Sequence, residues 1–116
     1  MKQVHFSHLL RTLLVIGLTS GVMSVRAQAV DVAAAEDLIK ANKCGKCHSL
    51  DKQKDGPSFQ KTAAKYKGKA EGDAKLFTHL TTSPMIEIDG VKEEHQKIKA
   101  KDDAAVKNVV KYILSR

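Results

Sequence analysis

The chain is poor in aromatic residues. Among its 116 residues there is no tryptophan, and two tyrosines with three phenylalanines make up an aromatic share of 4%. A core built on large aromatic side chains is therefore excluded. A chain of this length holds one domain at most, and small domains often depend on a metal, a disulfide or a cofactor because their own core is modest. We therefore expect a non-protein group to fill much of the interior.

Basic patches interleaved with aromatic residues are also missing. The chain carries 20 lysines and arginines against 13 acidic residues, a formal net charge of +7 at pH 7. Without aromatic partners this charge does not indicate a nucleic-acid surface. It suits docking to partners with acidic surfaces, and it suits equally a solvated surface that keeps the protein soluble.

No apolar run is long enough to span a bilayer comfortably. Lys2 and Arg11 give a basic start, residues 13–25 are mostly apolar, and Ala27-Gln28-Ala29 has the small-x-small pattern of a signal peptidase site. We interpret residues 1–29 as a secretory signal peptide and residues 30–116 as one exported, periplasmic domain without stable membrane insertion. An uncleaved membrane anchor is the alternative.

The two ends of the exported part have helical patterns. Asp31 is a suitable N-cap for a helix over residues 32–42, with Leu38 and Ile39 as core candidates. Asp102 or Asp103 opens a last helix whose apolar residues share one face: Val106, Val109, Val110, Ile113 and Leu114. These two helices are expected to supply most of the core.

The middle of the chain is predicted to hold two shorter helices, over residues 57–66 and 73–80. Pro57 suits the start of the first, and the second carries Leu76 and Leu80. Residues 81–101 are expected to be irregular because Pro84 and Asp89-Gly90 act as breakers. No segment has a convincing strand pattern, so the sequence predicts an all-α domain.

The motif that carries chemistry is Cys44-x-x-Cys47-His48. Two thiols at this spacing can each add to one vinyl group of a haem, and the next residue then places an imidazole under the iron. A thioredoxin-like site would need a βαβ context, and a zinc site would need two more ligands, which His79 and His95 offer only at wide, irregular spacing. A disulfide is the remaining alternative, and covalent haem c is the interpretation we adopt.

At this point the chain resembles the small bacterial class I c-type cytochromes of the c-551/c-552 type. The resemblance covers nearly the whole exported part. It rests on a short helix leading into CGKCH, on Gly56-Pro57-Ser58-Phe59, on Ala63-Ala64-Lys65-Tyr66 and on the closing helix AAVKNVVKYILSR.

The resemblance implies a class I cytochrome c fold of about four short helices around one covalently attached haem c. Cys44 and Cys47 would hold the haem, His48 would be the proximal iron ligand, and the Pro57 carbonyl would accept the ring N–H of His48. The first and last helices would cross, which brings Leu38 and Ile39 near the apolar face of the last helix.

The distal iron ligand departs from the family pattern. These cytochromes usually supply a methionine from the loop before the last helix, and Met85 is the one methionine of the exported part. Met85 lies too far from the last helix, however, whereas His95 lies near the expected position when counted from either side. We therefore expect a bis-histidine variant, with Met85 as the alternative and His79 as a surface or packing residue. His95 as a solvated loop histidine also remains open.

Two axial ligands leave no vacancy on the iron for oxygen or peroxide, so the expected function is electron transfer and not enzymatic catalysis. A second histidine in place of methionine lowers the reduction potential, other factors being equal. The partners would be redox proteins that meet this monomer briefly at the haem edge. The alternatives are a haem-based gas-binding or peroxidase-like protein, and an electron-accepting subunit of a periplasmic dehydrogenase.

Overall fold

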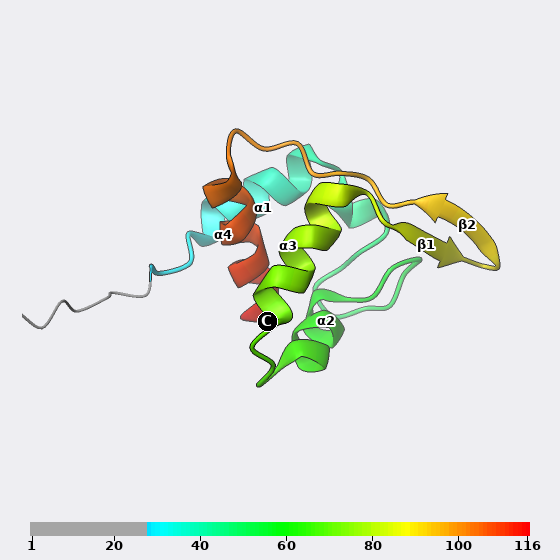
Figure 1. The fold of residues 1–116 in the computed structure, drawn as a ribbon, viewed down its shortest axis with the longest axis horizontal. Helices are drawn as coiled ribbons and strands as arrows, with labels where there is room; N and C mark the ends of the chain where they lie inside the picture. Colours follow the sequence, from blue (N-terminus) through cyan, green and yellow to red (C-terminus); the bar gives the residue numbers. More distant parts are fainter. Residues whose placement is uncertain (1–27) are drawn as a thin grey trace, which may run out of the picture.

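The computed structural model describes residues 28–116, so residues 1–27 of the predicted signal peptide lie outside the described residues. Within the described range the chain forms four α-helices, one short 3-10 turn and a β-hairpin (Figure 1). In chain order these are α1 (Val32–Ala41), η1 (Cys44–Lys46), α2 (Phe59–Tyr66), α3 (Gly72–Thr82), β1 (Met85–Ile88), β2 (Val91–Glu94) and α4 (Asp103–Leu114). None of the helices described here has the length and apolar character needed to cross a membrane.

Polar side chains fix where three of the helices begin. Asp31 caps α1 and Asp102 caps α4, and each carboxylate accepts a backbone N–H three residues further on, at 3.0 and 2.8 Å. Both predicted caps are therefore confirmed. Ser58 caps α2 in the same way, so this helix begins at Phe59, two residues after the predicted start at Pro57.

The core is built on one face of α4, which packs against α1, α2 and α3. Four residues of the predicted stripe, Val106, Val109, Val110 and Ile113, are buried, and Tyr112 is buried with them, whereas Leu114 is only partly buried. Leu38 and Ile39 of α1 pack against this cluster, as expected from the resemblance. Two polar contacts add to the α1–α4 packing. The Tyr112 hydroxyl donates to Glu36 at 3.0 Å, and the Asn108 amide pairs with the backbone of Asp31.

The segment expected to be irregular is ordered over most of its length. Helix α3 runs through Thr82, and β1 and β2 then form an antiparallel hairpin that projects from the helices (Figure 1). The expectation that no strand forms is wrong here. Asp89 and Gly90 have φ angles of 50° and 81°, and positive φ at both central residues is what a two-residue hairpin turn requires. The alternation Ile-Glu-Ile before this turn is a strand signal that the sequence already contained.

Candidate functional site

A cavity of about 1070 Å³ lies between the η1 turn, α2, α3, the hairpin and α4. Its apolar walls include Ile39, Phe59, Leu76, Ile98 and Val109. This volume is at the upper end of the roughly 300–1,000 Å³ that protein cavities for cofactors and ligands offer. The helices that form the core thus leave room for a large apolar group beside α4.

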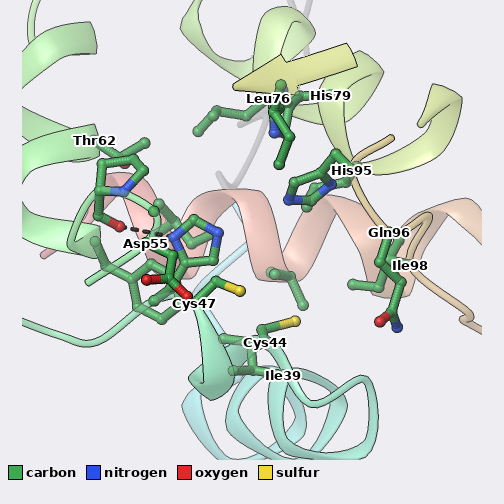
Figure 2. Close-up of a pocket in the computed structure, with 18 of the residues that line it drawn as sticks. Ile39, Cys44, Cys47, Asp55, Thr62, Leu76, His79, His95, Gln96 and Ile98 are labelled. Atoms are coloured by element: carbon green, nitrogen blue, oxygen red, sulfur yellow. Dashed lines mark hydrogen bonds between the residues drawn. The ribbon is translucent and has the colours of Figure 1, made fainter. Parts of the chain in front are cut away.

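Two cysteines lie on one side of this cavity. Lys43 follows the C-cap residue of α1 and has a left-handed φ of 56°, and this turn leads the chain into η1. Both thiols are free and half-buried, and Figure 2 shows them on the side of the cavity opposite His79. Burial raises the pKa of the Cys44 thiol above its usual value, more than the backbone hydrogen bond at this residue lowers it.

The His48 ring is held by three neighbours. Its Nδ1 lies 2.7 Å from the Pro57 carbonyl oxygen, and Phe59 stacks on the ring with centroids 5.9 Å apart. A Cβ on Gly56 would come within 2.5 Å of His48 Cε1, so only a glycine fits beside the ring. A carbonyl oxygen only accepts, so Nδ1 carries the proton and Nε2 is the nitrogen left free to bind a metal.

His95 faces His48 across the cavity. The two ring centroids are 6.1 Å apart, and the planes are tilted by 53°. The His95 Nδ1 is buried and has no hydrogen-bond partner among the described residues. Burial, and then the charge of His48, lowers the pKa of His95, which favours the neutral imidazole that a metal ion binds.

The His79 ring lies beside that of His95. The two ring centroids are 4.3 Å apart, and both residues line the cavity (Figure 2). Burial is the main cause that lowers the pKa of His79, and the charges of His95, His48 and Lys65 lower it further. No ring contact joins His79 to His48, so His95 is the histidine that directly faces the first one.

Met85 points away from this group. Its side chain is 60% exposed at the start of β1, and it does not line the cavity, whereas the next three residues of the hairpin do. Of the two sequence candidates for the distal position, the fold therefore brings His95 and not Met85 to the cavity.

The backbone around His95 is anchored at several points. The His95 N–H donates to the Pro84 carbonyl at 2.9 Å, which closes the base of the hairpin, and the Ile98 N–H donates to the Leu80 carbonyl at 2.8 Å. Asn42, a buried residue at the end of α1, also contacts this segment. Sequence analysis missed Asn42, because a contact between residues so far apart leaves no local signal, and it used Gly56 only as part of the segment Gly56-Pro57-Ser58-Phe59 that carries the resemblance.

The residues present fit a haem. Two imidazoles bound on opposite sides of one metal ion, at metal–nitrogen distances of about 2.0–2.1 Å, have ring centroids about 6.4 Å apart. The observed separation of the His48 and His95 rings is 6.1 Å. The two thiols and the volume of the cavity agree with the same group. A helical fold with a Cys-x-x-Cys-His turn on one side of such a cavity defines a c-type cytochrome.

Comparisons with known proteins give the family. The family model for cytochrome c matches residues 32–116, and the chain belongs to this family, whose members bind haem c covalently. The predicted resemblance to small class I c-type cytochromes and the predicted fold are confirmed. Cys44 and Cys47 fit the haem-binding motif of the family.

Several known cytochromes that are similar to this chain support its place in the family. The class 1 cytochrome MtoD from Sideroxydans lithotrophicus ES-1 superimposes with a TM-score of 0.70 and 48% identity, covering 75% of this chain and 97% of that one. Cytochrome c552 of Nitrosomonas europaea gives a TM-score of 0.57 and 25% identity, covering 69% and 96%. Cytochrome c-551 of Pseudomonas denitrificans is 43% identical over 50 residues, which are 43% of this chain and 61% of that protein's length.

Proposed function

We propose that this chain is a single-haem, periplasmic electron carrier that passes one electron at a time between redox partners. The observation that carries the proposal is the pair His48 and His95, which face each other across an apolar cavity at the spacing of two ligands on one metal ion. Family membership supports electron transfer as the general activity. The bis-histidine assignment and the periplasmic shuttle are the parts that this proposal adds.

Each residue of the site has a defined part. Cys44 and Cys47 form the two thioether links, His48 is the proximal ligand, and His95 is the distal one. The haem iron supplies the one-electron change between its ferric and ferrous states. The Pro57 carbonyl holds the proton on His48 Nδ1, which keeps Nε2 available and makes the imidazole a stronger donor.

Two features favour electron transfer over catalysis. If His48 and His95 both hold the iron, no ligand position would remain for a substrate, and the walls of the cavity are mostly apolar. Histidine in place of methionine should also give a lower reduction potential than that of a His/Met cytochrome of the same fold. We therefore do not expect enzymatic activity.

The partners are proposed to be periplasmic redox proteins that bind transiently to a monomer. Residues 30–116 carry 17 lysines and arginines against 13 acidic residues, and this net charge of +4 suits partners with acidic docking surfaces. Such steering weakens as the salt concentration rises. Residues 1–29 would direct export and be removed, which leaves a domain from residue 30 to residue 116.

Carbon monoxide tests the function directly. The exported holoprotein should retain its haem after denaturation, undergo reversible one-electron reduction, and leave its ferrous spectrum unchanged under carbon monoxide at neutral pH. Rapid carbon monoxide binding by the folded ferrous protein would instead favour a gas-binding or peroxidase-like function. A protein that releases its haem on denaturation would contradict the proposal altogether.

A further inference from the structure

We infer that Asn42 is a positioning residue for the distal ligand, and that it sets how readily His95 leaves the iron. The inference rests on the proposed bis-histidine function and extends it to a residue outside the iron's own ligands. Asn42 is the C-cap residue of α1, two positions before Cys44, and it is only 7% exposed.

The Asn42 side chain pairs with the backbone of Lys99 in both directions. Its Nδ2 donates to the Lys99 carbonyl at 3.1 Å, and its Oδ1 accepts the Lys99 N–H at 2.8 Å. The same Nδ2 also donates to the Leu38 carbonyl of α1 at 2.9 Å. The amide thereby joins the end of α1 to the segment that follows the hairpin.

A fourth contact brings the anchor next to the ligand itself. The backbone carbonyl of Asn42 accepts the Gln96 side-chain amide at 3.0 Å. Gln96 directly follows His95 in the chain, and Figure 2 shows both side chains. Asn42 is thus hydrogen-bonded to residues 96 and 99, which lie one and four positions after His95. The segment between them has one further backbone anchor in the described structure, the bond from Ile98 to Leu80.

The position of the His95 ring depends on this backbone. Its Nδ1 has no hydrogen-bond partner among the described residues, so no polar contact at this nitrogen fixes the ring. The ring is held instead by its packing against His79 and by the backbone on its two sides, which is bound to Pro84 at His95 and to Asn42 further along. Because Asn42 also belongs to the helix that leads into Cys44, one side chain couples the covalent attachment of the haem to its distal ligand.

Loss of the amide has a predictable result. In Asn42→Ala the N–H and carbonyl of Lys99 lose the partner that they have in a part-buried pair of hydrogen bonds, which favours states in which the segment moves away and these groups bind water instead. Those are the states in which His95 is off the iron. The equilibrium structure can stay close to that of the wild type while the ligand exchanges faster.

The test is the rate at which cyanide binds the ferric holoprotein, because cyanide can bind the iron only after His95 has dissociated from it. We expect Asn42→Ala to bind cyanide at least tenfold faster than the wild type, and Gln96→Ala to change in the same direction by a smaller factor. The matched control is Asn108→Ala. Asn108 makes the same two-way pairing with the backbone of Asp31 at 2.7 and 2.9 Å, and it does not line the cavity. It should stay within twofold of the wild type.

His95→Ala separates failure of this inference from failure of the proposed function. If His95→Ala binds cyanide no faster than the wild type, His95 is not the distal ligand, and the bis-histidine proposal falls together with the inference. If His95→Ala is fast but Asn42→Ala keeps the wild-type rate, only the role of Asn42 is refuted. Equal acceleration in Asn42→Ala and Asn108→Ala would also refute it, because general loosening would then explain both. Should Asn42→Ala fail to fold, Gln96→Ala and Asn42→Asp decide the question.

Discussion

Substitution of Gly56 by alanine should displace His48, the proposed proximal ligand. An added Cβ would lie 2.5 Å from Cε1 and 2.8 Å from Nδ1 of His48, and 3.1 Å from the Cys47 carbonyl oxygen. Ordinary contacts at such a Cβ begin near 3.4 Å. Cys44 and Cys47 fix the haem, and the Gly56 N–H is bound to the Cys47 carbonyl, so the backbone has little freedom to yield. The imidazole must therefore move by about 1 Å, the difference between these distances.

Two consequences of this movement can be given a size. Overpacking of this kind costs about 1–3 kcal/mol of stability. The movement also weakens the 2.7 Å hydrogen bond from His48 Nδ1 to Pro57, which makes the imidazole a poorer donor to ferric iron. If the bond contributes about 1 kcal/mol to the preference for the ferric state, the reduction potential rises by about 40 mV.

The assay is a spectroelectrochemical titration of Gly56→Ala together with urea unfolding, with Gly45→Ala as the control. Gly45 lies inside the Cys-x-x-Cys-His motif, and a Cβ there would have nothing within 4 Å. The control should therefore keep the wild-type potential. A Gly56→Ala protein with unchanged stability and potential would show that His48 is not held as described here.

Three further predictions concern stability. Asp102→Ala removes the N-cap of α4 and should cost about 1 kcal/mol in urea unfolding without changing the haem spectrum; an unchanged midpoint would contradict the cap. Lys43→Gly relieves a left-handed residue at φ 56° and should raise stability by up to about 1 kcal/mol, so a loss would refute that strain. Burial, followed by the hydrogen bond and the charge of Glu36, raises the pKa of Tyr112. The contribution of Tyr112 to the free energy of unfolding should therefore be fully present below the usual tyrosine pKa of about 10. It should fall as the pH rises through the higher pKa of the folded state. In Tyr112→Phe that fall should disappear, and an unchanged fall would assign it to other groups.

The helices were predictable because their signals are local. The stripe on α4 and the caps at Asp31 and Asp102 each lie within a few residues of the helix that they define. The hairpin was missed because Asp89-Gly90 was interpreted as a breaker, although the same pair between alternating apolar residues is a strong hairpin signal. The pair Asp-Gly occurs both in loops that end regular structure and in hairpin turns, so only the flanking residues distinguish the two.

The site residues, too, divide into those with a local sequence signal and those without one. Cys44, Cys47 and His48 form one local motif, and counting from both sides was enough to single out His95. The close approach of Gly56 to His48 and the hydrogen bonds between Asn42 and residue 99 correspond to no local pattern in the sequence. They arise only when α1, the motif and the segment before α4 come together in space.

The identity of the distal ligand tests the account most directly, and the near-infrared and visible spectra of the ferric protein reveal it. The wild type should be low-spin without the charge-transfer band of methionine-ligated haem, Met85→Leu should have the same spectrum, and His95→Ala should become high-spin. The opposite result would be a methionine band in the wild type that is lost in Met85→Leu and retained in His95→Ala. That outcome would make His95 a bystander and the protein a His/Met electron carrier of higher potential.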